Sequence, residues 1–220
     1  MKSAYLFHVG MIPISSAVAT TWGIMLALTI FLLLAGRRFS TEPGLLQSAL
    51  EGIVSAMIDA IEAVIPGKSE TLLPFIGTLW VFILISNLCG IVPGLSAPTA
   101  NLSVTAALAI LVFLSVHWYG IKSEGLKRYL HHYTSPSPIL LPFHLISEVS
   151  RTVALAVRLF GNIMSLEMAA LLVLLVGGLL VPIPLLMLHI VEALVQAYIF
   201  GMLALIYVSG AIESQQRKKQ

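Results

Sequence analysis

The chain has 220 residues, of which 58% are hydrophobic and only 10% are charged, and its formal net charge is +2. This composition excludes an ordinary soluble domain and places the chain among membrane proteins. Several apolar runs reach the roughly 20 residues that cross a bilayer core of about 30 Å. They are continuously apolar instead of alternating, which predicts spanning helices and argues against a β-barrel. The single cysteine, Cys89, excludes a disulfide framework.

The N-terminal quarter contains one membrane segment and one amphipathic helix. An apolar run at about 17–36 is too long for the core of a signal peptide and is expected to remain as an anchor. A loop with Ser, Thr, Pro and Gly residues follows it. Residues 45–65 then have an amphipathic pattern, in which three acidic residues interrupt apolar positions: Glu51, Asp59 and Glu62. Because these charges are acidic, we expect this helix to pack on protein instead of lying on lipid.

Four further apolar segments complete the chain. Segments at about 72–95 and 103–121 are joined by a turn with Pro and Gly and are expected to form a tight antiparallel hairpin. A polar loop covers 122–138. The last two segments, 139–180 and 185–212, are unusually long and are separated by Gly and Pro residues. A continuous helix over 139–180 would be roughly 60 Å long, about twice the hydrocarbon thickness, so it must tilt steeply, bend or break.

The predicted fold is all-α: one membrane domain over 1–220 with five membrane helices and an amphipathic helix. The last two of the membrane helices are expected to form a long, steeply tilted hairpin. Three basic clusters flank these segments, and the positive-inside rule places each of them in the cytoplasm. They are Arg37-Arg38, the group of Lys122, Lys127 and Arg128, and the run from Arg217 to Lys219. The number of membrane crossings between successive clusters agrees with this placement. It predicts that the N-terminus faces outward and that the C-terminus lies in the cytoplasm.

One charge lies deep inside a long apolar segment. Arg158 is about twenty residues from Pro138 and about twenty from the Gly177-Gly178 break, so its side chain cannot easily reach water. An arginine at the centre of a spanning helix costs about 2.5–3.5 kcal/mol, so it should face a cavity or a partner. Its guanidinium stays protonated, which suits a fixed gate better than a proton relay. Glu148 and Arg151 lie closer to the aqueous interface, where a structural role is favoured.

The helical faces around Arg158 favour a partner outside its own helix. At 100° per residue it shares a face with Arg151 and Asn162, whereas Glu167 points to the opposite side and lies about 13 Å further along. Small residues nearby permit the close approach of another helix: Ala154, Ala156 and Gly161. The alternative interpretation is a structural ion pair of Arg158 with Glu192 or Glu167 that only fastens two helices.

A second set of polar residues follows one stripe of the last helix. His189, Glu192 and Gln196 fall at i, i+3 and i+7, so an imidazole, a carboxylate and an amide line an otherwise apolar surface. A proton or hydrated-cation path needs such a line of exchangeable groups, and the alternative is a set of interhelical hydrogen bonds. Asn87 and Asn101 flank the outer turn between the second and third segments, where they are either path residues or ordinary turn residues.

Four strings of the sequence resemble one protein family. The string SRTVALAVRLFGN, at 150–162, looks like the signature of subunit a of F-type ATP synthases, whose RLFGN core holds the stator arginine. Three further blocks are similar to the same family: LWVFILISNLCGIVPG at 79–94, PTANLSVTAALA at 98–109 and HIVEALVQAYIF at 189–200. The resemblance covers about 70–214 in order, and the N-terminal quarter agrees mainly in its general topology.

This resemblance implies an ion-translocating stator subunit, carrying H⁺ or Na⁺, with two half-channels against a rotating ring of subunit c. An ion would load a ring carboxylate from one half-channel and leave through the other after nearly a full turn. Arg158 would match the arginine that makes the passing carboxylate release its ion and that blocks a direct leak, through Coulomb attraction in a water-poor site. A steep tilt along the ring would account for the excess length of the last two helices.

The resemblance also carries over to other residues. Glu167 and His189 match the polar pair that lines the outer half-channel, and Gln196 matches the amide that neighbours the arginine across the hairpin. Asn87 matches the asparagine of the family's second segment, and Asn162 closes the RLFGN core.

This sequence departs from the family pattern at three positions. Asn101 stands where many relatives have aspartate, which weakens any role as a proton acceptor there, and Thr152 stands where proline is common. Glu192 is an additional carboxylate on the stripe of His189. We expect Glu192 to help form the ion path.

The expected partners are the ring of subunit c, the peripheral-stalk subunit b, the remainder of the ATP synthase and the lipid bilayer, with no nucleic acid. The subunit is expected to have no independent catalysis, no cofactor and no metal, and to lie in an energy-coupling membrane, the bacterial plasma (inner) membrane. The rival class is a secondary transporter that binds an anionic substrate at Arg158. Against it, no inverted repeat appears, and few polar groups flank that arginine.

Overall fold

The computed structural model describes residues 5–9, 12–36, 44–92, 95, 97–125, 141–178, 181 and 183–216. Within these ranges, five helices are long and apolar enough to cross a membrane, which confirms the predicted number. They are α1 (Ser16–Gly36), α3 (Ser69–Leu88, extended by the 3-10 turn η1, Cys89–Ile91), α4 (Leu102–Glu124), α6 (Leu141–Gly177) and α7 (Ile183–Gln216). The predicted loop at 122–138 begins later than expected, because α4 continues to Glu124, and the loop residues from 126 onward lie outside the described part.

One element was not predicted. Ahead of α1, β1 (Tyr5–Val9) and β2 (Ile12–Ser15) form a two-stranded antiparallel ladder. Phe7 pairs with Ile14 and Val9 with Ile12, and the register is irregular near Tyr5. The all-helical prediction therefore describes the chain from Ser16 onward, and this short hairpin is added at its N-terminal end.

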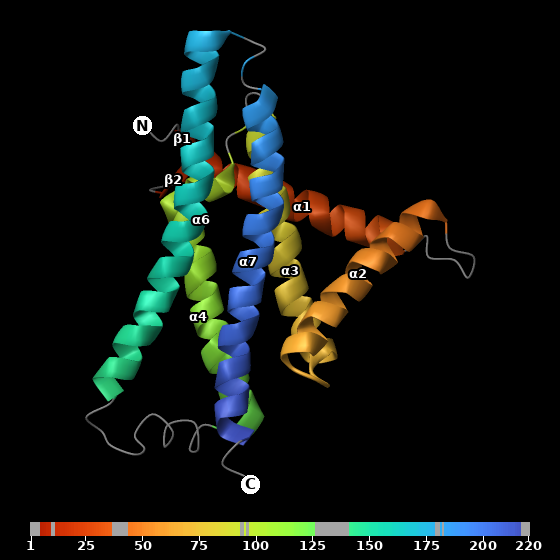
Figure 1. Cartoon of the computed structure of the whole chain (residues 1–220). Helices are drawn as coiled ribbons and strands as arrows, with labels where there is room; N and C mark the ends of the chain where they lie inside the picture. Colours follow the sequence, from red (N-terminus) through yellow and green to blue (C-terminus); the bar gives the residue numbers. More distant parts are fainter. Residues whose placement is uncertain are drawn as a thin grey trace.

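Helix α1 runs in a different direction from the C-terminal hairpin. In Figure 1 α1 lies across the course of α6 and α7 instead of alongside them. Its hydroxyl groups are satisfied within the helix, since Thr20 donates to the Ser16 carbonyl at 2.8 Å and Thr29 to the Met25 carbonyl at 2.7 Å. The 37 residues of α6, at 1.5 Å per residue, make a helix of about 55 Å, which is longer than the hydrocarbon core. The steep tilt of the two long helices stays a prediction.

The amphipathic helix α2 (Leu45–Val64) packs on protein through its C-terminal half. Ile61 is fully buried, whereas Ile53 and Val54 in the other half are about half exposed. The turn into α3 is closed by the Glu62 carboxylate, which accepts a hydrogen bond from the Gly67 N–H at 2.8 Å. Hydrogen bonds from the Ser69 side chain and from this N–H lower the pKa of Glu62 below its ordinary value. The predicted protein contact is thus confirmed for about half of the helix.

Helices α3 and α4 do not form the tight hairpin that the sequence suggested. Both helices pack against α7. They contact each other near the ends that are predicted to face the cytoplasm, where the Phe75 and Tyr119 rings lie 6.1 Å apart. At the other end they are joined through η1 and η2 (Pro98–Ala100). The apolar runs correctly predicted the two helices, but they could not show that both pack against a third helix, α7.

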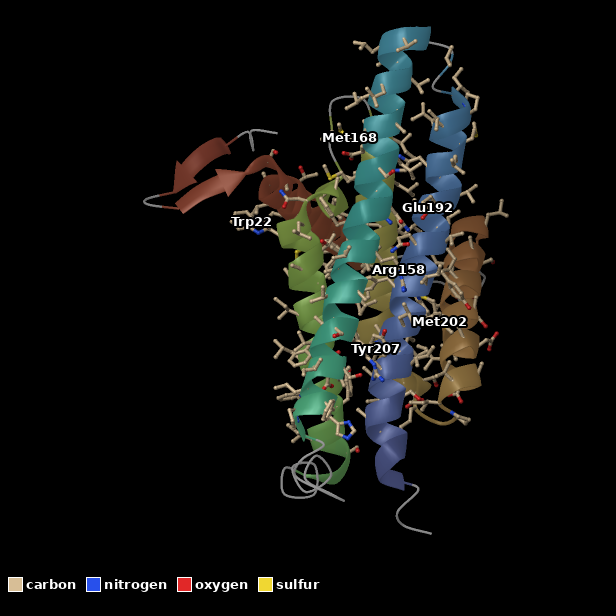
Figure 2. The ribbon with its side chains drawn as sticks, turned by 60° about the vertical axis from the view of Figure 1, so that its left-hand side comes forward. Trp22, Arg158, Met168, Glu192, Met202 and Tyr207 are labelled. Atoms are coloured by element: carbon tan, nitrogen blue, oxygen red, sulfur yellow. The ribbon has the colours of Figure 1, made fainter. Side chains whose placement is uncertain are left out.

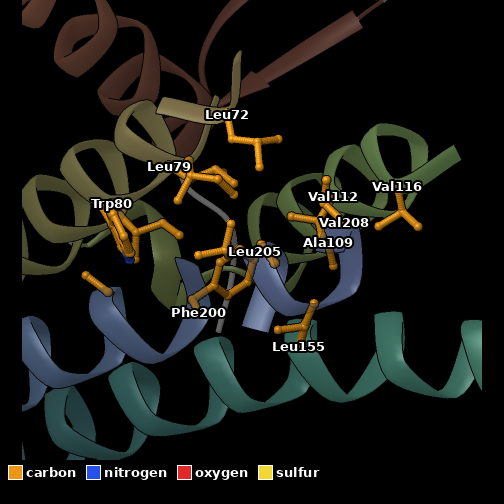
Figure 3. Close-up of a cluster of buried hydrophobic side chains, with 14 of the residues drawn as sticks. Leu72, Leu79, Trp80, Ala109, Val112, Val116, Leu155, Phe200, Leu205 and Val208 are labelled. Atoms are coloured by element: carbon orange, nitrogen blue, oxygen red, sulfur yellow. The ribbon is translucent and has the colours of Figure 1, made fainter. Parts of the chain in front are cut away.

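The core is centred where α7 meets α3 and α4, as Figure 3 shows. Phe200 and Leu205 from α7 and Leu155 from α6 are almost fully buried there. Trp80 of α3 donates its ring N–H to the Tyr198 carbonyl at 3.2 Å and lies directly against Gly201. A Cβ at position 201 would overlap the Trp80 ring, so the absence of a side chain sets how closely α3 and α7 approach.

The long hairpin of α6 and α7 has the predicted break between its two arms. Helix α6 ends at Gly177, and Gly178 adopts a positive φ of 73° that most other residues avoid. Helix α7 starts at Ile183 with Pro184 in its first turn, where a missing N–H is harmless. The arms then run antiparallel beside each other over most of their length (Figure 1).

Candidate functional site

Arg158 lies near the middle of α6 on the face directed out of the molecule. Its side chain is exposed; the adjacent Val157 is 52% exposed, and Val153, further round the helix, is 54% exposed. Among the described residues Arg158 forms no ion pair and no hydrogen bond. The structural ion pair with Glu167 or Glu192 that the sequence left open is therefore absent from the described part of the chain. A fixed positive charge is presented on an apolar surface, with no partner among the residues that the structure describes.

One turn further along α6, Asn162 bridges to two residues of α7. Its Nδ2 group donates to Glu192 Oε1 and to Gln196 Oε1, at 2.9 Å in each case. Gln196 is 1% exposed, and its own Nε2 group has no hydrogen-bond partner among the described residues. In Figure 2, Arg158 lies along the hairpin between Glu192 on one side and Tyr207 on the other. The arginine therefore sits directly beside a polar bridge between the two long helices.

Glu167 points the opposite way from Arg158, as the helical spacing predicted. Its Oε1 accepts a hydrogen bond at 2.9 Å from the Ala97 backbone N–H, just before η2. The same oxygen would be 3.0 Å from a Cβ at Gly90, and His189 Cε1 would be 3.2 Å from that Cβ. Gly90 thus leaves the space in which a carboxylate from α6 and an imidazole from α7 approach each other.

His189 and Asn87 belong to a buried polar network at the end of α3. His189 Nε2 lies 3.2 Å from the Asn87 backbone carbonyl, and since a carbonyl only accepts, this nitrogen carries the proton. The Asn87 side chain accepts from Thr99 Oγ1 at 2.7 Å and lies 3.5 Å from the Ala193 carbonyl, to which it donates. The network ties α3, η2 and α7 together and holds the imidazole in one orientation.

The predicted stripe of α7 therefore faces two different neighbours. His189 contacts the end of α3, while Glu192 and Gln196 contact Asn162 of α6. Asn101 does not join either group. It is the N-cap of α4, where its side chain accepts from the Ser103 N–H at 3.0 Å, which is the ordinary turn role that the sequence left open.

Sequence reasoning missed three participants of this site: Gly90, Thr99 and the Ala97 N–H. Gly90 and Thr99 had a signal only in their place in the two blocks at 79–94 and 98–109, and Ala97 directly precedes the second block. Neither a glycine nor a backbone group has chemistry that can be read from a pattern. They came to light because η1 and η2 fold back against α6 and α7.

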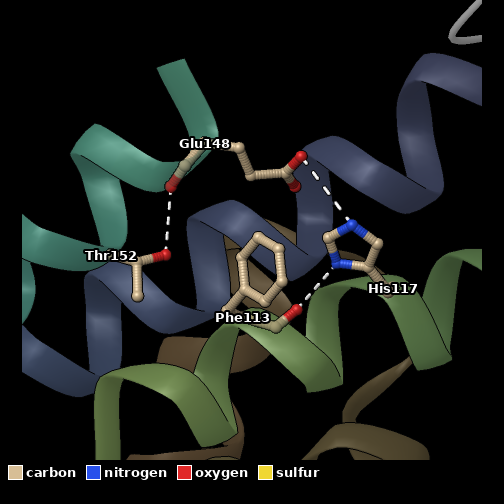
Figure 4. A network of polar contacts seen from close by, with 4 residues as sticks. All are labelled: Phe113, His117, Glu148 and Thr152. Atoms are coloured by element: carbon tan, nitrogen blue, oxygen red, sulfur yellow. Dashed lines mark hydrogen bonds and ion pairs between the residues drawn. The ribbon is translucent and has the colours of Figure 1, made fainter. Parts of the chain in front are cut away.

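On the other side of Arg158, polar residues form pairs between side chains. His117 of α4 and Glu148 of α6 lie 3.8 Å apart, and His117 Nδ1 is 2.8 Å from the Phe113 carbonyl, as Figure 4 shows. The Arg151 guanidinium lies 5.5 Å from the centre of the Tyr207 ring, a cation–π distance. These contacts fasten α4 and α7 to α6, in keeping with the structural role expected for Glu148 and Arg151.

No group of three or more His, Cys, Asp or Glu that could hold a metal ion occurs within the described ranges. The polar residues around Arg158 are instead carboxylates, amides and one imidazole, spread along two helices. Such groups can bind and pass a proton or a small cation, but they do not make a nucleophile with its base.

Comparison with known proteins gives matches along almost the whole chain. A family model described as ATP synthase A chain matches residues 18–209. The chain is 60% identical over 214 residues to "ATP synthase subunit a 2" of Pelobacter propionicus, a match that covers 97% of this chain and 94% of that relative. It is 57% identical over 217 residues to "ATP synthase subunit a" of Legionella pneumophila, covering 98% and 94%. With "ATP synthase subunit a 1" of Chlorobium luteolum the identity is 45% over 209 residues, covering 94% of each chain.

Proposed function

The chain belongs to the family of ATP synthase A chains, and we propose that it is the ion-translocating stator subunit of a rotary ATP synthase, moving H⁺ or Na⁺. Family membership makes it a component of that complex and not a catalyst in its own right. The bacterial relatives and the five apolar helices of the described part make it a bacterial membrane protein. The observation that carries the proposal is Arg158, a permanent charge on an apolar outer face that has no partner within the described ranges of its own subunit.

In this proposal the partner of Arg158 is a carboxylate on the ring of subunit c. A lone arginine in a membrane is costly, so a passing carboxylate is attracted to it and releases its own ion. The permanent charge also repels any cation that would pass directly along the hairpin. The exposed valines beside Arg158 offer the smooth apolar surface on which such a ring can slide.

The outer half-channel would be lined by Glu167 and His189, and it would lead past Glu192 and Gln196 to Arg158. The residues are in the right order along the hairpin. Glu167 and His189 meet at Gly90, and about 7 Å nearer to Arg158 along α6 the Asn162 bridge holds Glu192 and Gln196. Asn87 supports the first step, because its backbone carbonyl orients His189.

The orientation and the partners complete the proposal. The positive-inside rule puts the Gly177–Gly178 end of the hairpin outside and the C-terminus in the cytoplasm. The part of the hairpin that holds Glu167 and His189 would therefore be the one open to the outside. The subunit c ring covers the Arg158 face. The peripheral-stalk subunit b is expected on another face, where α1 and the N-terminal half of α2 expose apolar residues such as Trp22, Ile53 and Val54.

The experiment replaces Arg158 with Ala in the intact ATP synthase, reconstituted into liposomes. We expect ATP-driven ion transport to fall by at least about 100-fold, because electrostatic groups of this kind contribute such factors, and passive ion leak to rise. Arg151→Ala is the matched control, since Arg151 shares the α6 face two turns away but is held by Tyr207. It should retain most of the transport and should not leak.

Two outcomes would contradict the stator role. One is normal coupling without added leak in Arg158→Ala. The other is an equal loss in Arg158→Ala and Arg151→Ala, since that would make any positive charge on this face equivalent.

A further inference from the structure

The bridge between α6 and α7 has an unusual distribution of donors and acceptors. Two oxygens from one helix, Glu192 Oε1 and Gln196 Oε1, lie within 2.9 Å of the same point, which the Nδ2 group of Asn162 occupies. One of these oxygens belongs to a carboxylate and the other to an amide. A carboxylate and a carbonyl that converge from i and i+4 on one point are a typical half-shell of ligands for a hard monovalent cation or a hydronium ion.

The Glu192 carboxylate has no direct ionic partner in the bridge. It forms no ion pair among the described residues, and there it accepts from the neutral amide of Asn162. The other titratable groups at this level are Arg158 on α6 and His189 on α7, and neither of them hydrogen-bonds to Glu192. A partly buried charge with only a neutral partner is costly in an apolar environment. A bound cation would remove that cost.

Gln196 provides the second, independent observation. Its side chain is 1% exposed, yet its Nε2 group has no hydrogen-bond partner in the part of the chain that the structure describes. The oxygen is the atom that bears on a cation site, because an amide N–H group donates and cannot bind a cation. Here the amide is held with its oxygen toward Asn162 and Glu192, while its donor is left without compensation.

We propose that Glu192 and Gln196 form a transient binding site for the transported cation within the stator itself, and that the Asn162 amide fills this site when it is empty. The site rests on the proposed function and names a step of it: the cation pauses here after Glu167 and His189 and before the ring carboxylate. When a cation arrives, the Asn162 amide turns away and the two oxygens become ligands. Arg158, one turn along α6, keeps the binding weak, because a fixed positive charge lowers the affinity for any cation beside it.

The test uses the intact complex in liposomes, with ATP synthesis driven by a fixed diffusion potential. The cation concentration is varied on the membrane face opposite the catalytic sector, with Na⁺ at constant pH in one series and with pH in the absence of Na⁺ in the other. The series that drives synthesis identifies the cation. The measured quantity is the cation concentration that gives half-maximal synthesis.

The proposal predicts shifts of opposite sign in two variants. Glu192→Gln keeps the shape and can still accept from Asn162, but it loses the charge, so the half-maximal concentration should rise about tenfold. Asn162→Ala removes the group that the cation must displace, so the half-maximal concentration should fall about tenfold. A bridge that only fastened the helices would lower the maximal rate in both variants and would shift neither concentration.

Glu51→Gln is the matched control, because Glu51 on α2 also accepts from an amide, Gln47 Nε2 at 2.8 Å, but lies outside the hairpin. It should change nothing. The site is disproved if the half-maximal concentration is unchanged in Glu192→Gln, or if it rises in Asn162→Ala. Arg158→Ala separates the two proposals: if it remains coupled, the stator role itself fails, whereas if it uncouples and Glu192→Gln has no effect, only the cation site fails.

Discussion

The two faces of the α6–α7 hairpin differ in how they are completed. The inward face is filled by the chain itself: Leu159 and Ala204 are fully buried, and Gly201 lets Trp80 lie against the backbone of α7. The outward face has apolar side chains that are about half exposed, such as Val153 and Leu194, and it carries Arg158, which has no ion pair in the described part of the chain.

This difference shows where the chain is a finished structure and where it needs another molecule. On the inward side buried side chains of the same subunit pack against one another, as in any protein core. On the outward side neither the apolar surface nor the charge is matched. A charge in such a position is tolerated in a membrane only when a partner or water reaches it. The inward face therefore sets stability, and the outward face is left for the proposed ring.

The largest effect that would test this contrast is expected in a comparison of two glycine substitutions, one on each face of the hairpin. Gly201→Ala should destabilise the subunit by about 3 kcal/mol, because its Cβ would overlap the Trp80 ring and force α3 and α7 apart. Gly161→Ala on the outward face should leave stability unchanged or slightly higher, since no atom lies within 4 Å of its Cβ position and alanine favours a helix. The measurement is the unfolding temperature of the purified subunit in detergent, without the ring that is proposed to cover the Gly161 face. Similar losses in both variants would mean that the two faces do not differ in this way.

A smaller effect is expected where the polar site meets the inward face. In Gly90→Ala the new Cβ would lie 3.0 Å from Glu167 Oε1, 3.1 Å from Ala97 Cβ and 3.2 Å from His189 Cε1, so these neighbours must give way by a few tenths of an ångström. We expect ion transport to fall about tenfold while the amount of assembled complex stays the same, because misplacement at a transfer site affects rate more than stability.

The readout for Gly90→Ala is ATP-driven ion uptake, normalised to the amount of complex in the membrane. Gly210→Ala on α7 is the control, since nothing lies within 4 Å of its Cβ position. Unaltered transport in Gly90→Ala would remove Gly90 from the proposed path, and a loss of assembled complex would make its role structural.

The smallest effect is expected for the pair of His117 and Glu148. The two side chains are 29% and 18% exposed and 3.8 Å apart, so a double-mutant cycle with His117→Gln and Glu148→Gln should give a coupling energy of only about 0.5 kcal/mol. Transport should change less than about twofold, because this pair fastens α4 to α6 at a distance from Arg158. A tenfold loss of transport in either single variant would instead place the pair on the inner ion path.

Much of the architecture could be predicted from local patterns. The five membrane helices follow from apolar runs of sufficient length, and the ends of α6 and α7 follow from Gly177, Gly178 and Pro184. Arg158 stood out because a charge inside such a run is rare. The opposite directions of Arg158 and Glu167 followed from helical geometry alone, and the hydrogen bond from Ala97 to Glu167 agrees with it.

The neighbours of each stripe could not be predicted in the same way. Periodicity says which residues share a helical face, but it does not say which helix that face meets. For this reason the sequence predicted a tight hairpin of α3 and α4, although both helices pack mainly against α7. It also treated His189, Glu192 and Gln196 as one line, although these residues contact different helices.

By itself, then, the sequence determined that this protein is a bundle of membrane helices with one arginine that needs a partner, because hydrophobic length and helical period are local properties. Tertiary structure decided what surrounds that arginine. Only the packing of α7 against α3 and α4 turns Glu167 and His189 toward Gly90 and brings Asn162 to Glu192. Close contacts such as that of the Trp80 ring with Gly201 determine this packing. These contacts join residues that are far apart in the chain, and their formation depends on how side chains fit together in three dimensions.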